Sequence, residues 1–221
     1  MIVRFCSACV LAVVLTGPGS SVTKGPAQKA PGYSRVQSYP LIVATRRFRI
    51  TLDPTRKLTL RVEDGRRIWE GIPRAWKPWK LHVADIDGDS FPEILVALHK
   101  STRHFRKPHN CLFVYGFDGR TVTPRWFGSR LAFRFTDFAV AALHSPPALL
   151  ALETKLNGRK CVGSYLWNGF GFTRVGEIGS WRNAKIMGVE GSEVLISANG
   201  AAMRRYRIPA ADETPRSPVG N

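Results

Sequence analysis

The segment ADIDGDSFPEILVA places carboxylates at alternate positions of one short stretch. Counted from Asp85, the first, third and fifth positions are Asp85, Asp87 and Asp89, and the ninth is Glu93. In a tight loop the odd positions converge on one point, and the backbone carbonyl of Phe91 at the seventh position converges with them. Oxygen ligands of this kind are those that Ca²⁺ prefers, six to eight of them at roughly 2.3–2.6 Å. The segment therefore predicts a calcium site formed by Asp85, Asp87, Asp89, Phe91 and Glu93.

This crowding of negative charge is unusual for so basic a chain. Of the 221 residues, 33 are Lys or Arg and 16 are Asp or Glu, which gives a formal net charge of +17. Converging carboxylates repel one another unless a cation lies among them or some of them bind protons. The alternative is an acidic surface hairpin whose Asp side chains accept hydrogen bonds from their own turn. A bound ion is expected to be structural, because its ligands are protein oxygens and no His or further Glu stands beside the loop as a general base.

The loop is not an EF-hand, which requires Gly at the sixth position and Glu at the twelfth, where this chain has Ser90 and Val96. The pattern D-x-D-G-D-x-x-x-E between two apolar segments instead resembles the cation loop of FG-GAP repeats, also called VCBS repeats. Such repeats build the β-propellers of integrin α-subunits and of many exported bacterial proteins. The resemblance runs from Trp76 to about Glu153. It implies a Ca²⁺ ion held by the carboxylates at positions one, three, five and nine and by the carbonyl at position seven, although Ser90 replaces the usual Gly.

The later repeats lack this charge pattern. AALHSPPALLALE has no carboxylate in its loop, and GVEGSEVLIS keeps only Glu190 and Glu193. We therefore expect one metal site in the chain.

Short segments rich in β-branched and aromatic residues, bounded by turn residues, fill the chain from about residue 39 to residue 208. The tripeptides EDG, FDG and WNG are hairpin signals, because Asp-Gly and Asn-Gly tolerate the positive φ of tight hairpins. No segment keeps an apolar period of 3.6 residues for more than two turns. The pattern predicts an all-β fold.

The hairpins recur along the chain. Their turn glycines, Gly65, Gly119 and Gly169, give a period near 50 residues with about four strands in each unit, which is typical of a β-propeller blade. We predict a small β-propeller of about four four-stranded blades, in which the N-terminal segments LIVAT and RFRITL complete the ring. The alternatives are a β-sandwich or an open array of antiparallel sheets.

Two cysteines occupy equivalent places in neighbouring repeats, since Cys111 and Cys161 each precede a turn glycine by 8 residues. Equivalent positions in packed sheets lie about 10 Å apart. A disulfide requires Cα atoms within about 7 Å of each other. The two cysteines are therefore predicted to be unpaired.

The termini have a different composition from the middle of the chain. Residues 1–21 combine an early Arg, an apolar run too short to span a membrane, and a small-residue break, which predicts a secretory signal peptide. Residues 22–38 are predicted to be a flexible linker, 39–208 the FG-GAP-like propeller domain, and 209–221 a disordered tail. The mature chain is expected to be secreted, or periplasmic at the cell envelope, with no transmembrane span.

The segment HKSTRHFRKPHN is a second candidate site, because it is basic and longer than a tight turn requires. Arg can hold phosphate, sulfate or carboxylate groups with two hydrogen bonds at once. The alternative is a solvated basic loop without a ligand. Its predicted anion-binding residues are Arg103, His104, Arg106 and Lys107.

The sequence contains no G-x-S-x-G, H-E-x-x-H, P-loop or C-x-x-C motif, so nothing indicates an enzyme. The main hypothesis is a monomeric, calcium-binding module or scaffold at the cell envelope, with a protein or an anionic glycan as partner. The alternative is an envelope enzyme acting on an anionic polysaccharide, which would require two carboxylates in a cleft. A nucleic-acid partner is not expected for an exported protein.

Overall fold

A computed structural model describes residues 35–128, 130–141 and 147–209 of the chain. The predicted signal peptide, most of the predicted linker and nearly all of the predicted tail lie outside these residues. The described part contains 15 strands and one short 3₁₀ turn, Arg74–Trp76. It contains no helix that is long and apolar enough to cross a membrane.

The strands form four antiparallel sheets in chain order. The first contains β1 (Gln37–Val43), β2 (Arg46–Leu52), β3 (Leu58–Val62) and β4 (Arg67–Gly71). The second contains β5 (Lys80–Ala84), β6 (Glu93–Lys100), β7 (His109–Phe117) and β8 (Val122–Gly128). The third contains β9 (Arg134–Ala141), β10 (Ala148–Thr154), β11 (Lys160–Trp167) and β12 (Phe172–Trp181). The fourth contains β13 (Ala184–Glu190), β14 (Glu193–Ala198) and β15 (Arg204–Arg207).

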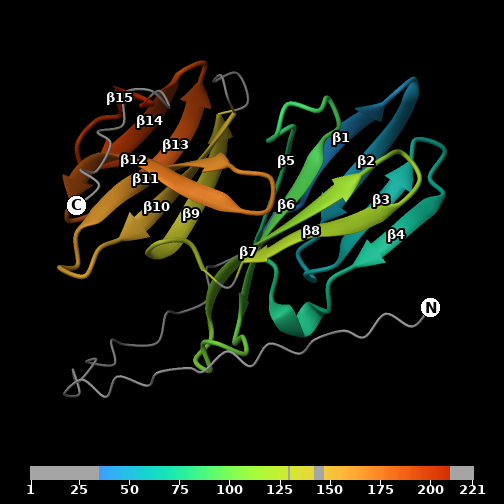
Figure 1. The fold of residues 1–221 in the computed structure, drawn as a ribbon, viewed down its shortest axis with the longest axis horizontal. Helices are drawn as coiled ribbons and strands as arrows, with labels where there is room; N and C mark the ends of the chain where they lie inside the picture. The colour runs from blue at the N-terminus through green and yellow to red at the C-terminus, as the bar shows by residue number, and fades with distance from the viewer. Residues whose placement is uncertain (1–34, 129, 142–146, 210–221) are drawn as a thin grey trace, which may run out of the picture.

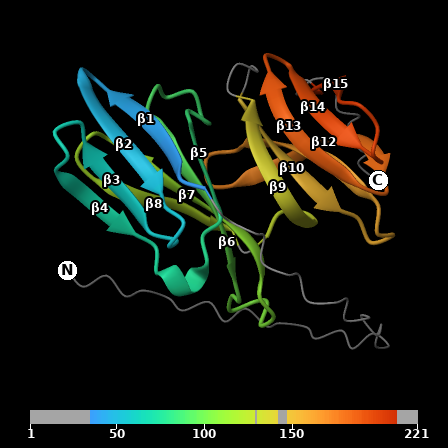
Figure 2. The ribbon, with the colours of Figure 1, turned by 180° about the vertical axis from the view of Figure 1, so that it is seen from behind.

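The four sheets are arranged as the blades of a four-bladed β-propeller, which confirms the predicted fold class (Figure 1). The first strand of each sheet packs against the first strand of the next, from β1 to β5 to β9 to β13. Figure 2 shows the same succession of sheets from behind. The fourth blade differs from the prediction, because it has three strands within the described residues. LIVAT and RFRITL lie in the first two strands of the first blade.

The repeat seen in the sequence is confirmed by the strand pairing. Gly65, Gly119 and Gly169 each lie between the third and fourth strands of a blade, with φ of 86°, 88° and 98°. Such positive φ values suit glycine, because it has no Cβ to clash with the backbone. A blade therefore begins with the apolar strand pair and ends with the Gly-containing hairpin.

The two cysteines hold matching places on the third strands of adjacent blades. Cys111 pairs with Leu98 across β6 and β7, and Cys161 pairs with Glu153 across β10 and β11. Both cysteines are buried and free, which confirms that they are unpaired.

Three hydrophobic clusters lie between successive blades. In β6, Ile94, Val96 and Leu98 face the cluster shared with the first blade. The alternate residues Leu95 and Ala97 face the cluster shared with the third blade. Because successive side chains of a strand point to opposite faces, a strand packed on both sides must be apolar along its whole length. This explains why EILVAL reads as an uninterrupted apolar run rather than as an alternation.

Polar side chains connect the first strands across the blades. The Gln37 side chain donates to the Trp79 carbonyl at 3.0 Å and accepts from the Leu81 amide at 2.8 Å. Lys80 on β5 forms an ion pair of 2.5 Å with Asp137 on β9. These contacts join the second blade, which carries both predicted sites, to the first and third blades.

Candidate cation loop and basic surface

The predicted calcium ligands lie in the turn between β5 and β6, which we call the acidic loop (residues 85–93). Ala84 pairs with Glu93 at its base, so the two strands close the loop tightly. The turn requires positive φ at Gly88 (81°) and at Ser90 (70°). A positive φ is uncommon for a residue other than glycine, so Ser90 strains the turn at the position where the FG-GAP pattern has Gly.

The structure brings the three aspartates together. Asp85, Asp87 and Asp89 each offer a carboxylate oxygen, and these oxygens lie within 4.8 Å of one another. Oxygens on one Ca²⁺ ion at roughly 2.3–2.6 Å from it are separated by about 5 Å at most. The spacing of the three aspartates therefore fits a calcium ion.

The same carboxylates also accept hydrogen bonds from their own turn, as the acidic-hairpin alternative predicts. Asp85 accepts from the amides of Gly88 at 2.7 Å and Ser90 at 2.9 Å. Asp89 accepts from the amide of Phe91 at 2.8 Å. The loop is thus shaped by its own backbone bonds, whether or not an ion binds.

Glu93 does not join the three aspartates. Its side chain is 1% exposed, and its Oε2 accepts from the Ile86 amide at 3.0 Å. Its Oε1 accepts from Arg125 Nη1 at 2.5 Å. Burial raises the pKa of Glu93 to about 7, against the lowering effect of its bonds to Ile86 and Arg125. The aspartates of the predicted ligand set fit a cation, whereas the Glu93 carboxylate is directed at other partners.

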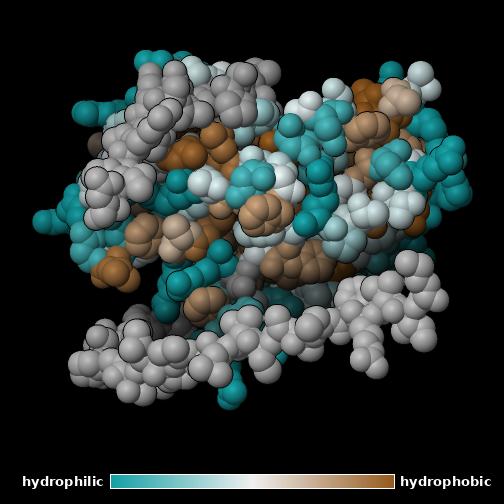
Figure 3. Space-filling view, in the orientation of Figure 1, coloured by the Kyte–Doolittle hydropathy of each residue, from teal (hydrophilic) through white to brown (hydrophobic). Residues whose placement is uncertain are grey.

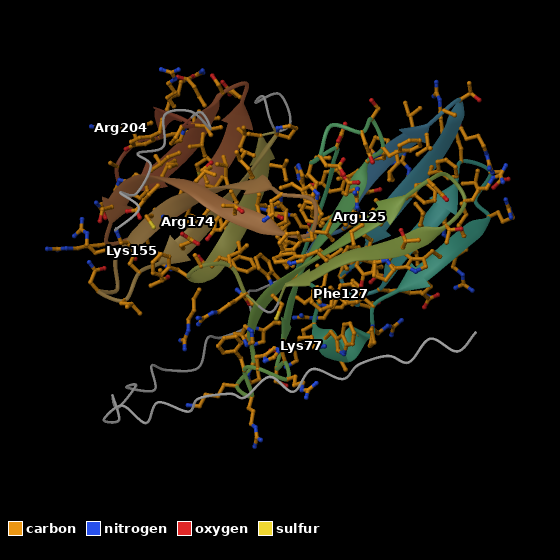
Figure 4. All side chains as sticks on the ribbon, in the orientation of Figure 1. Lys77, Arg125, Phe127, Lys155, Arg174 and Arg204 are labelled. Carbon is orange, nitrogen blue, oxygen red and sulfur yellow. The ribbon has the colours of Figure 1, made fainter. Side chains whose placement is uncertain are left out.

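The residue that sequence analysis missed is Arg125 on β8 (Figure 4). Its Nη2 donates to Asp87 Oδ2 at 2.6 Å, and its Nη1 lies 3.8 Å from Asp89 Oδ2. Burial acts to lower the pKa of Arg125, but its bonds to Asp87 and Glu93 outweigh burial and raise the pKa above its ordinary value. One signal could have found it, because the next repeat places Arg174 at nearly the same offset from its turn glycine, beside buried Glu153.

The basic residues predicted to bind anions lie at the far end of the β6–β7 hairpin, which projects from the body of the propeller in both ribbon views (Figures 1 and 2). Two backbone hydrogen bonds between Thr102 and Phe105, of 2.9 and 3.2 Å, shape the turn. This turn exposes the four predicted residues, Arg103, His104, Arg106 and Lys107.

Other elements add bases around this hairpin. Lys100 Nζ lies 3.4 Å from the centroid of the Trp76 ring, and the guanidinium of Arg130 lies 4.5 Å from that of Phe105. The Lys77 carbonyl accepts from the His99 amide at 3.2 Å, which joins the 3₁₀ turn to β6. Together these side chains form what we call the basic surface: Lys77, Lys100, Arg103, Arg106, Lys107 and Arg130. None of the six forms an ion pair with a described carboxylate.

An exposed aromatic ring lies next to the basic surface. Phe127 is 48% exposed and stacks on Phe113, with ring centroids 4.3 Å apart. Phe113 also contacts Trp76, the ring that Lys100 covers. Figure 4 places Phe127 between Arg125 and Lys77, and Figure 3 shows hydrophobic surface at the same place.

A pocket of about 200 Å³ lies beside the acidic loop and is lined in part by Asp89, Glu93, Asp118 and Arg125. Asp118 accepts from the amides of Thr121 and Arg120, and these bonds lower its pKa. Glu93 is nearly inaccessible from this pocket, and Arg125 covers its outer oxygen.

A scan against protein-family models gives no match for the chain, and a search of curated protein sequences gives none either. The blade arrangement is compatible with a propeller repeat protein, and no family match confirms the resemblance to FG-GAP repeats.

Proposed function

We propose that the chain is an exported module at the cell envelope that binds an anionic partner through its basic surface. The observation that carries the proposal is a projecting hairpin whose Lys and Arg side chains form no ion pair with a described carboxylate. Elsewhere on the propeller, some exposed bases, such as Arg47, Arg67 and Arg205, lie within 4.0 Å of a glutamate. Others, such as Arg182 and Arg204, are also exposed without an ion pair to a described carboxylate, so the basic surface is distinguished by six bases without such an ion pair gathered on and around one projecting hairpin.

An uncompensated group of bases raises the local concentration of anions and speeds their association. The three Arg side chains of the surface can hold sulfate, phosphate or carboxylate groups with paired hydrogen bonds. Phe127 adds an apolar face against which a sugar ring can pack. This combination favours an anionic glycan over an anionic protein as the partner.

We propose in addition that Asp85, Asp87 and Asp89 hold a calcium ion. The support is the spacing of their oxygens and the resemblance of the loop to FG-GAP repeats. A bound ion would supply positive charge that pins the turn between β5 and β6. Because Arg125 already bonds Asp87, we expect weak binding, with a dissociation constant of about 10⁻⁴–10⁻³ M as in extracellular calcium modules.

The basic surface is tested by calorimetric titration with a sulfated and a uronic-acid polysaccharide. The variant Arg103→Ser/Arg106→Ser/Lys107→Ser is expected to bind about tenfold more weakly, or worse. The matched control, Arg182→Ser/Lys185→Ser/Arg204→Ser, removes the same charge from exposed positions near and on the fourth blade and is expected to bind within about threefold of the parent. Equal losses in both variants would mean unspecific attraction, and no binding to either polymer would refute the glycan partner.

A second candidate, an envelope enzyme acting on an anionic polysaccharide, is favoured by the carboxylates around the pocket beside the acidic loop. Chain cleavage of the same two polymers, followed by reducing-end assay, tests it. Cleavage that disappears in Asp118→Asn while binding remains would support the enzyme over the binding module.

A further inference from the structure

The guanidinium of Arg125 bridges the turn of the acidic loop and its last residue. Nη2 bonds Asp87 in the turn, and Nη1 bonds Glu93 at the start of β6. We infer that Arg125 is the resident cation of the acidic loop: it closes the turn without a metal ion and limits how tightly any divalent cation can bind there. This role is independent of the anionic partner.

The burial of the carboxylates favours a cation beside them. Glu93 is 1% exposed and the side chain of Asp87 is 16% exposed. An ionised carboxylate at such a depth is strongly disfavoured unless it is paired and hydrogen-bonded. Arg125 serves both carboxylates at once, because its planar fork offers two separate donors in a fixed geometry.

Two neighbours hold Arg125 in this position. Its aliphatic chain crosses Gly116 of β7, where an added Cβ would stand 3.0 Å from Arg125 Cδ. Its guanidinium lies 5.7 Å from the centroid of the Trp167 ring, which belongs to the third blade. The cation is thus anchored by the strand next to it and by the neighbouring blade, and not by the loop alone.

The arrangement sets up competition with a metal ion. A divalent cation on the three aspartates needs Asp87, whose Oδ2 accepts from Arg125. The ion would therefore have to share that carboxylate and would lie close to a fixed positive charge. Removal of the Arg125 charge should leave the loop dependent on an added cation.

The test is thermal unfolding of the full chain in chelator and in about 10⁻⁴ M Ca²⁺, close to the dissociation constant expected of the parent chain. The parent chain should unfold within about 2 °C under the two conditions, as expected when the ion concentration is near the dissociation constant. Arg125→Met should unfold about 5–10 °C lower in chelator, because it leaves a buried carboxylate without a partner. Ca²⁺ should restore part of this loss, which a purely structural role of the Arg side chain would not produce.

Three control variants test whether the effect is specific to the charge of Arg125. Arg120→Met, an exposed base in the β7–β8 turn, should behave like the parent. Arg125→Met/Glu93→Gln should be more stable in chelator than Arg125→Met, because the buried negative charge is removed with its partner. If Arg125→Met does not fold, this double variant and Arg125→Lys, which keeps the charge, still yield the comparison with the parent.

Two results would overturn the inference. One is a parent chain that loses about 5 °C or more in chelator, since the loop would then depend on a metal. The other is a pair of observations made together. Arg125→Met/Glu93→Gln would be no more stable than the sum of the effects of its two single substitutions predicts, and Ca²⁺ would not stabilise Arg125→Met. Loss of glycan binding in the hairpin variants would leave the inference untouched, so the two proposals fail separately.

Discussion

The side chain of Arg125 lies across the backbone of Gly116, so that a methyl group at Gly116 would stand 3.0 Å from Arg125 Cδ and 3.4 Å from its Cγ. The glycine provides the space that allows the guanidinium to reach Asp87 and Glu93. Because the two residues pack so closely, the ionic contacts of Arg125 on β8 depend on the presence of a glycine at position 116 of β7.

Gly116→Ala is therefore expected to displace Arg125 and to destabilise the chain by about 1–3 kcal/mol, as overpacking does in well-packed sites. Urea unfolding measures the loss. In an Arg125→Met background the same substitution should cost much less, because the displaced side chain has lost its ionic contacts. An equal cost in both backgrounds would show that Gly116 matters for the β-strand itself and not for Arg125.

His82 predicts a pH dependence of stability. Burial, with the nearby charge of Lys80 as a smaller cause, lowers the pKa of His82 to about 4 from its ordinary 6.5. Between about pH 6.5 and pH 4, His82 therefore binds a proton in the unfolded chain but not in the folded chain. Stability should fall as pH drops from about 6.5 to about 4, by at most about 1.4 kcal/mol per pH unit.

The measurement is urea unfolding of the parent and of His82→Gln at pH 7, 5.5 and 4. Other groups titrate in this range, so the difference between the two chains isolates His82. That difference should shrink with falling pH if His82 is neutral in the folded chain. A constant difference would contradict the assignment.

In the third blade a buried carboxylate forms an ion pair that the second blade lacks at the equivalent position. Glu153, fully buried, bonds Arg174 at 3.2 Å and the Tyr165 hydroxyl, yet its equivalent in the second blade is Leu98. Arg174→Met alone should cost about 3–5 kcal/mol, because the Glu153 charge remains buried. Glu153→Leu/Arg174→Met should recover most of this loss in urea unfolding. A double variant as unstable as the single one would mean that the ion pair itself is required by the blade.

The free cysteines should be inert in the folded chain. Burial raises the pKa of both Cys111 and Cys161 to about 11, so almost no thiolate is present at neutral pH. Treatment with an aromatic disulfide reagent should label neither of these two thiols within hours, and both after addition of denaturant. Rapid labelling of one of them without denaturant would reveal local opening of its strand.

The sequence predicted those features of the fold and the site that depend on residues close together in the chain. The turn glycines predicted the hairpins, their period predicted the blades, and the acidic loop brought its three aspartates together because they lie within five consecutive residues. Arg125 was missed because it stands 32 residues after Glu93. Its approach depends on the pairing of β7 with β8, where the register shifts between Val114 and Tyr115. A shift of one residue reverses the side of a sheet that a side chain faces, and residue spacing alone does not reveal it.

The cation preference of the acidic loop is tested most directly by calorimetric titration of Ca²⁺ into the parent chain, Arg125→Met and Asp87→Asn. We expect a dissociation constant of about 10⁻⁴–10⁻³ M for the parent. Binding should be at least about tenfold tighter for Arg125→Met and should disappear in Asp87→Asn. Micromolar binding to the parent that Arg125→Met leaves unchanged would contradict the account, because the metal and not the guanidinium would then be the cation around which the loop is built.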